Sequence, residues 1–296
     1  MLVWTILIYG LVNSSIFLLM AMGFSLVYGV ARVANFAHGT LYVLGGFIAW
    51  TFLKGIGLPW WLAIILSLII LVLIGIALYR FCLMRVRGMP ISEIILSFAI
   101  ALMILEGLRI KVGGFKGLVG VGYYLPVLID GSINVGGVQV DFQRLFCIAG
   151  ALILLVAIYL LTHYTKIGLS LIGTANDERA ALMLGIDSDR VAAVAVAIGS
   201  SLAGLGSLLI SPLSTIYTEA GYSVLTNAIA VCIIGGLGSW FGTVIASIVL
   251  GYGTAISTTI IGQMYESVVL FGAIILLLII RPSGLFGKQK ELEERV

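Results

Sequence analysis

The chain has 296 residues, of which 61% are hydrophobic and only 10% charged, and its mean hydropathy is +1.21. A soluble globular protein does not cover its surface with so few charged residues, so the composition excludes that class and indicates a membrane protein with many spans. The formal net charge of +3 is too small to indicate a nucleic-acid partner.

Long segments without charge mark the spans in chain order. A helix needs about 20 apolar residues to cross the ~30 Å hydrocarbon core of a bilayer. We predict about eight or nine spans, at Trp4–Gly29, Ala34–Phe52, Pro59–Tyr79, Pro90–Leu108, Arg144–Leu161, Val191–Ile210, Val224–Leu237, Phe241–Thr259 and Ser267–Ile280. Val224–Leu237 is short and is bounded by glycines, which leaves open whether it crosses or forms a half-helix or re-entrant segment. The fold class is an all-α, polytopic transmembrane helix bundle, with room for broken or re-entrant helices, in a single domain, 1–296.

The polar segments between the spans predict how the bundle faces the two sides of the membrane. If the loop 162–190 is cytoplasmic, alternation puts most Lys and Arg on that side, including the cluster Arg80, Arg85 and Arg87 and the tail 282–296. The remaining cations fall outside: Lys54, Arg109, Lys111, Lys116 and Arg144. The positive-inside rule therefore favours an external N-terminus and a cytoplasmic C-terminus. If Val224–Leu237 does not cross, the C-terminus changes side.

The external loop 109–143 contains the stretch "VLIDGSINVGGVQVDF", in which apolar and polar residues alternate around Asp130-Gly131. This pattern predicts a small extracytoplasmic hairpin with a D-G turn. The hairpin is either a solvated lid or a docking surface for an external partner, and the sequence leaves both readings open.

A polar island, "GTANDERAALMLGIDSDR" from Gly173 to Arg190, interrupts two apolar spans. Thr174 and Asp177 form a T-x-x-D variant of the capping box, and Gly185 suits the left-handed residue after a helix. We therefore predict a helix at about Ala175–Leu184. At 1.5 Å per residue it is roughly 15 Å long, too short to cross, so it would lie along the membrane surface or project from it.

The chemistry of this short helix leaves two readings. Its polar start includes Asn176, whereas Ala180, Ala181 and Leu184 give a small, smooth apolar surface that suits a groove in another protein. The alternative is an ordinary interfacial helix without a partner. Asp187 or Ser188 would then cap the next span.

Two groups of polar residues lie at the ends of apolar segments. In "RVANFAHGT", the residues Asn35, His38 and Thr40 crowd the boundary between the first two spans. They either line a translocation path at a broken helix or form an interfacial loop with satisfied hydrogen bonds. In the second half, Thr226 and Asn227 precede a glycine run, as Asn35 does, which weakly indicates an internal repeat.

The other charged residues of the spans fit structural roles. Glu93 follows Pro90 at a predicted helix start, and Glu106 and Arg109 are three residues apart and can pair. No cluster of His, Asp, Glu or Cys has catalytic or metal-ligand spacing, and no G-x4-G-K-[ST] phosphate loop is present. We therefore expect a non-catalytic chain that binds no cofactor.

Four stretches together resemble a known family. They are "ANDERAALMLGID" (Ala175–Asp187), "FSLVYGVARVANFAHGTLYVLGG" (Phe24–Gly46), "VCIIGGLGSWFGTVIASIVLG" (Val231–Gly251) and "RPSGLFG" (Arg281–Gly287). They are similar to the permeases of branched-chain amino-acid ABC transporters of the LivH type, in which the first stretch is the cytoplasmic coupling loop. The resemblance covers almost the whole chain.

The resemblance implies an inner-membrane permease subunit of an ATP-driven importer for branched-chain or similar apolar amino acids. Its partners would be a paralogous permease, giving a heterodimer, two cytoplasmic ATPases that use the ATP, and a periplasmic binding protein. Thr174, Asn176, Asp177, Ala180, Ala181, Leu184 and Gly185 would then couple to an ATPase, and Asn35, His38, Thr40, Thr226 and Asn227 would line the path. The alternatives are a permease for urea or short amides, or a stand-alone facilitative channel or secondary transporter.

Overall fold

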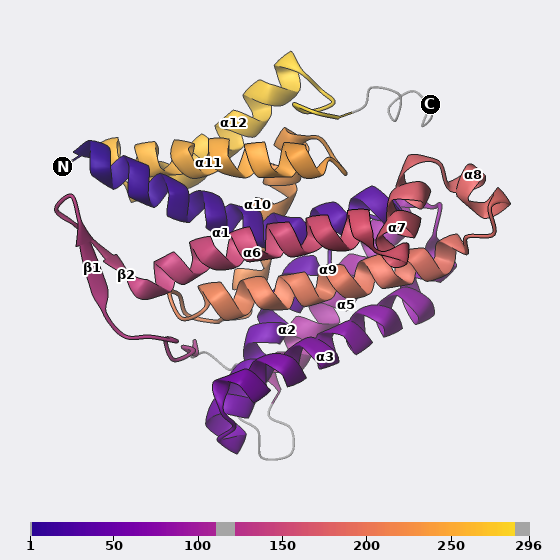
Figure 1. The fold of residues 1–296 in the computed structure, drawn as a ribbon, viewed down its shortest axis with the longest axis horizontal. Helices are drawn as coiled ribbons and strands as arrows, with labels where there is room; N and C mark the ends of the chain where they lie inside the picture. The colour runs from indigo at the N-terminus through magenta and orange to yellow at the C-terminus, as the bar shows by residue number, and fades with distance from the viewer. Residues whose placement is uncertain (1, 111–121, 288–296) are drawn as a thin grey trace.

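A computed structural model describes residues 2–110 and 122–287 of the chain. In these residues the protein is a bundle of long helices with one small hairpin, as the composition indicates (Figure 1). Five of the cations used to predict sidedness lie outside the described residues: Lys111, Lys116, Lys288, Lys290 and Arg295.

The helices of the first half are α1 (Leu2–Ala31), α2 (His38–Trp50), α3 (Trp60–Leu78), α4 (Met84–Val86) and α5 (Pro90–Arg109). Two π-helical turns, Thr51–Ile56 and Tyr79–Leu83, extend α2 and join α3 to α4. The second half comprises β1 (Ser132–Val135), β2 (Val138–Asp141), α6 (Phe142–Tyr164), α7 (Lys166–Asn176), α8 (Glu178–Met183), α9 (Ser188–Ile210), α10 (Ala220–Gly235), α11 (Trp240–Ile260), a 3-10 turn at Gln263–Tyr265 and α12 (Glu266–Ile280).

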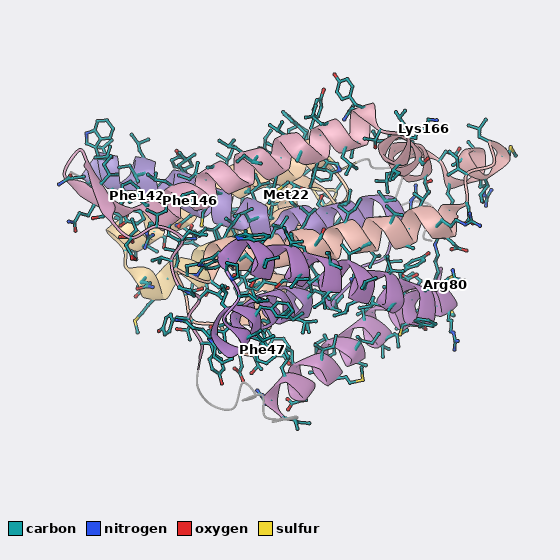
Figure 2. The ribbon with its side chains drawn as sticks, turned by 60° about the horizontal axis from the view of Figure 1, so that its bottom comes forward. Met22, Phe47, Arg80, Phe142, Phe146 and Lys166 are labelled. Carbon is teal, nitrogen blue, oxygen red and sulfur yellow. The ribbon has the colours of Figure 1, made fainter. Side chains whose placement is uncertain are left out.

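The bundle has two ends, which we name by their most prominent elements. At the hairpin end, the β1–β2 turn packs on Trp4 near the start of α1. At the α8 end, Ala31 at the end of α1 shares a buried cluster with Ala192 in the first turn of α9. Figure 1 shows α8 projecting beyond this end, on the side opposite the hairpin. Figure 2 shows Arg80 and Lys166 toward the α8 end and Phe142 and Phe146 toward the hairpin end.

Within the described residues, eight helices or continuous helix runs are long and apolar enough to cross a membrane, and α10 is shorter. At 1.5 Å per residue its 16 residues extend only about 24 Å. It crosses the middle of the bundle: Gly221 packs on Gly39, Asn227 lies near Met20 and Cys232 lies near the carbonyl oxygen of Ala21 (Figure 1). Glu219, just before α10, pairs with Arg109 at the C-terminal end of α5, whereas Gly238, just after α10, packs on Gly29 near the end of α1. α9 and α11 both run from the α8 end toward the hairpin end, so the segment 211–239 that joins them returns to the α8 end and is not re-entrant.

The hairpin is present, but the predicted position of its turn is wrong. Val135 pairs with Val138, so the turn residues are Gly136 and Gly137, with φ of 60° and 86°. A type I′ turn needs positive φ at both central residues, and two glycines adopt it without steric cost. Asp130-Gly131 instead precedes β1, where the Gly131 carbonyl accepts a hydrogen bond from Phe142 N at 3.1 Å.

Glycines bring the central helices into backbone contact. A Cβ on Gly23 of α1 would lie 2.5 Å from the carbonyl oxygen of Gly199 on α9. A Cβ on Gly39 of α2 would lie 2.0 Å from the carbonyl oxygen of Gly221 on α10. In lipid, helices associate through such small residues because close packing replaces the hydrophobic driving force available in water.

The C-terminal segment 281–287 returns to the end of α10. Leu285 N donates to Ile234 O at 2.8 Å, and Phe286 N donates to Gly235 O at 3.0 Å. These bonds satisfy carbonyls that the last turn of a helix leaves without intrahelical partners. Gly236, with φ of 97°, lies against the backbone of Gly287. The two glycine-rich stretches "IGGLG" and "PSGLFG" therefore form one packing unit.

Candidate functional site

The polar island contains the end of one helix and a second, short helix where a single helix was predicted. α7 continues through Thr174 to Asn176, and α8 begins only at Glu178. The prediction that Thr174 is an N-cap is wrong, because Thr174 lies in the last turns of α7 and is buried. Asp177 takes that role: its Oδ1 accepts a hydrogen bond from Ala180 N at 3.0 Å. A carboxylate cap is favoured at a helix start by the exposed N–H groups there.

Both later boundaries of the island agree with the prediction. Gly185 has φ of 80°, and its N–H donates to Leu182 O at 3.0 Å while Ile186 N donates to Ala181 O at 3.0 Å. This pair of bonds is a Schellman motif, which requires a left-handed residue after the helix. Asp187 caps α9 by accepting hydrogen bonds from the backbone N–H groups of its first turn.

The surface that α8 presents differs from the predicted one. Ala181 is only 3% exposed, so it packs within the chain and does not contribute to an outward surface. Thr174 is buried too, while Asn176, Asp177, Ala180, Leu184 and Gly185 are exposed. The apolar part of the surface is Leu182, Met183 and Leu184, of which Met183 is 89% exposed. Ala181 is the buried residue of this six-residue helix, so α8 rests on the chain there.

An arginine outside the island connects it to the bundle. Arg87, between α4 and α5, donates from Nη2 to Glu178 Oε1 and from Nη1 to Asp189 Oδ1, both at 2.6 Å. Ser188 Oγ donates to the same Glu178 oxygen at 2.7 Å, and Tyr79 OH donates to Asp189 Oδ1 at 3.1 Å. Burial alone would lower the pKa of Arg87, but Tyr79 and the two carboxylates raise it, so the guanidinium stays charged.

The polar residues of the first half lie in and after the irregular segment 32–37. Asn35, His38 and Thr40 are all buried. Asn35 Oδ1 accepts a hydrogen bond from Ala37 N at 3.0 Å, and Phe36 N donates to Ser97 Oγ on α5 at 3.1 Å. The chain therefore breaks between the first two spans as predicted, and the break is held by one local hydrogen bond and one to α5.

The polar residues of the two halves meet at α1. The His38 ring lies within 2.9 Å of the Met20 carbonyl oxygen through Nε2, in the space that Gly23 leaves free. Asn227 Nδ2 on α10 lies 3.9 Å from the Met20 sulfur. Asn227 and its neighbour Thr226 are partly exposed, unlike His38. Asn35 precedes its helix and Asn227 lies within α10, so these two residues are not at equivalent places in the halves.

A family model described as "Branched-chain amino acid transport system / permease component" matches residues 6–279. The chain belongs to this permease family. The match includes α8, the irregular segment before α2 and the whole of α10. The matched region therefore contains both the candidate coupling helix and the candidate path residues.

Several relatives of this permease cover nearly its whole length. It is 27% identical over 94% of both chains to the "High-affinity branched-chain amino acid transport system permease protein LivH" of Salmonella typhimurium. It is 27% identical over 95% of both chains to BraD of Pseudomonas aeruginosa, a protein of the same description. LivM of Escherichia coli is 23% identical, over 91% of this chain and 67% of LivM. No solved structure matches the chain.

The arginine network of the permease was not predicted from the sequence. In the sequence, Arg87 is one of three cations in a cluster, and Glu178 and Asp189 are part of a polar island; neither pattern indicates that they pair. The usable signal is the stretch "VRGMP", in which a glycine and a proline mark a turn directly before a helix. Nothing local in either stretch predicts that the turn faces the island, because about 90 residues separate Arg87 from Glu178 along the chain.

Proposed function

We propose that this chain is the transmembrane permease subunit of an ATP-driven ABC importer for branched-chain or related apolar amino acids. It lies in the bacterial inner membrane with the hairpin end outside and the α8 end in the cytoplasm, so its N-terminus is external and its C-terminus cytoplasmic. It acts with a paralogous permease as a heterodimer, with two ATPases that hydrolyse the ATP, and with a periplasmic binding protein. The chain itself binds no cofactor and catalyses no reaction.

The observation that carries this proposal is the exposed tip of α8. Leu182 and Met183 end α8, which projects from the bundle, Leu184 follows directly, and all three are exposed. Exposed adjacent apolar residues beyond the end of a bundle are typical of a protein interaction site. The chain joins α8 to α9 through Asp187. A displacement of α9 would therefore move this tip, and with it an ATPase groove that receives the tip.

We propose that the translocation path runs along the exposed face of α10. Tyr222, Ser223 and Thr226 lie on that face, which the chain's other helices do not cover. A face with hydroxyl groups on a helix that crosses the middle of the bundle suits the interface with the paired permease, where polar groups line a water-filled route. Asn35, His38 and Thr40 are buried within the chain, so they would support this route and would not face it.

The experiment is uptake of radiolabelled leucine by cells in which the gene is deleted and then restored, with urea as the competing substrate class. We expect leucine uptake to depend on the gene and on ATP, and urea uptake to depend on neither. Uptake that survives depletion of ATP would identify a facilitative channel or secondary transporter. Gene-dependent urea uptake in place of leucine uptake would identify the amide importer.

A matched pair of variants locates the coupling surface. Met183→Glu places a charge on the α8 tip, whereas Met264→Glu places one on an equally prominent methionine, 94% exposed, after α11 at the hairpin end. We expect Met183→Glu to abolish co-purification of the ATPases and leucine uptake, and Met264→Glu to change neither. Normal uptake with the Met183→Glu chain would contradict docking through α8.

A further inference from the structure

The turn that carries Arg87 is rigid. Met89 N donates to Val86 O at 3.0 Å, and Gly88 has φ of 85°, so residues 86–89 form a type II turn with Arg87 as its second residue. The buried Glu93 carboxylate accepts a hydrogen bond from Gly88 N at 2.8 Å and ties the turn to the first turns of α5. Arg87 is therefore held at a defined place before its side chain makes any contact.

The Arg87 side chain bridges three elements. Only 18% of it is exposed, and its two terminal nitrogens contact α8 through Glu178 and α9 through Asp189. Within the described residues, α8 is bonded to a residue outside the island at one place, where Glu178 pairs with Arg87. A planar guanidinium that donates to two carboxylates fixes direction as well as distance, which an ammonium does not.

We infer that Arg87 is the positioning residue for the coupling helix: it sets the orientation of α8 relative to α5 and α9, so that motion of an ATPase on the α8 tip moves the bundle instead of turning α8 alone. This inference rests on the proposed function for its consequence in transport. The structural half, that Arg87 holds α8, stands on the contacts alone. α8 has six residues and cannot keep an orientation by its own stability.

The structural half is tested on the full-length permease in lipid nanodiscs, in a background without Cys82, Cys147 and Cys232. Spin labels on cysteines at Met183 and at Ile95, an exposed residue of α5, report the distance between the α8 tip and the bundle. We expect a narrow distance distribution for the parent chain and a clearly broader one for Arg87→Gln. Arg85→Gln is the matched control, because it removes the same charge two residues away without removing a recorded ion pair, and its distribution should stay narrow.

Two further variants separate positioning from loss of folding. Glu178→Gln removes the α8 partner and leaves the Arg87–Asp189 pair intact, so it should broaden the distribution as well. Combining Arg87→Glu with Glu178→Arg and Asp189→Asn restores an ion pair of opposite polarity without placing the new carboxylate against Asp189, and should narrow it again. A distribution in Arg87→Gln that equals that of the parent chain overturns the inference.

The functional half is tested in the complete transporter, as leucine transported per ATP hydrolysed. We expect this ratio to fall about tenfold in Arg87→Gln, as for loss of one partly buried ion-pair network, and to recover in the charge-swapped variant. An unchanged ratio in Arg87→Gln overturns the coupling role. If the parent chain itself shows no ATP-dependent transport, the proposed function fails, and the spin-label comparison still decides whether Arg87 holds α8.

Discussion

At the scale of single residues, neighbours in the island have opposite environments. Ala180 is exposed, whereas Ala181 is almost completely buried and accepts the Schellman hydrogen bond from Ile186. Both residues are small and apolar, so their difference is one of direction around the helix and not of chemistry. A substitution at Ala181 therefore changes the fold of α8, whereas one at Ala180 changes the surface that α8 presents to a partner.

This difference gives a prediction for two glutamate variants. Ala181→Glu buries a carboxylate without a partner, which costs more free energy than a six-residue helix can supply, so α8 should unfold locally. Ala180→Glu should leave α8 folded and impair only ATPase binding. Limited trypsin digestion checks this, since Arg179 lies within α8: cleavage should be faster in Ala181→Glu than in Ala180→Glu. Equal rates in the two variants would show that Ala181 does not anchor the helix.

At the scale of elements, the bundle depends on the crossing of α2 with α10. The contact between Gly39 and Gly221 is backbone to backbone, and the His38 and Asn227 side chains meet α1 close to it. A backbone carbonyl cannot rotate away as a side chain does, so any added Cβ forces the two helices apart. Gly39 is therefore required for the close approach of α2 and α10.

We predict that Gly39→Ala destabilises the protein by about 1–3 kcal/mol, the usual cost of overpacking a tightly packed contact. Gly253→Ala on α11 is the control, because nothing lies within 4 Å of the Cβ that it adds. The measurement is the midpoint of thermal unfolding in detergent, which should fall for Gly39→Ala and stay constant for Gly253→Ala. An equal fall of the unfolding midpoint in both variants would mean that replacing glycine within a helix, and not the contact between α2 and α10, causes the loss of stability.

At the scale of the whole molecule, the two polar surfaces lie at opposite ends. The hairpin and the start of α1 form one end, and α8 with the first turns of α9 forms the other (Figure 1). The segment 281–287 packs on Gly236, two residues before the Gly238 that contacts Gly29, so the N-terminus of α1 and this C-terminal segment lie toward opposite ends. The separation requires one surface to face each side of the membrane.

Single cysteines test this arrangement in the background without Cys82, Cys147 and Cys232. Ser132 in the hairpin and Met183 on α8 are both exposed, whereas Ser188 is buried beside Arg87 and is a poor labelling site. We expect a membrane-impermeant maleimide added to intact cells to label the Ser132→Cys chain and not the Met183→Cys chain. Labelling of both from the same side would exclude the proposed topology.

The sequence by itself determined the class of the protein and most of its spans. Spans of about 20 apolar residues are set by the thickness of the bilayer, so charge-free length alone locates them. Capping and turn chemistry is also local, and for that reason Asp187 and the left-handed Gly185 were predictable. Thr174 was misjudged because a threonine can cap a helix or lie inside one, and here the apolar contacts of α7 carry the helix past it.

Only the tertiary structure decided which residues face one another. The segment 211–239, which contains the short α10, passes from one side of the bundle to the other because α9 and α11, which it joins, run in the same direction. Ala181 is inward because of how α8 rests on the chain, and the Arg87 network joins residues about 90 to 100 positions apart. Such contacts depend on how helices pack in three dimensions, and packing direction leaves no periodic trace in an almost uniformly apolar sequence.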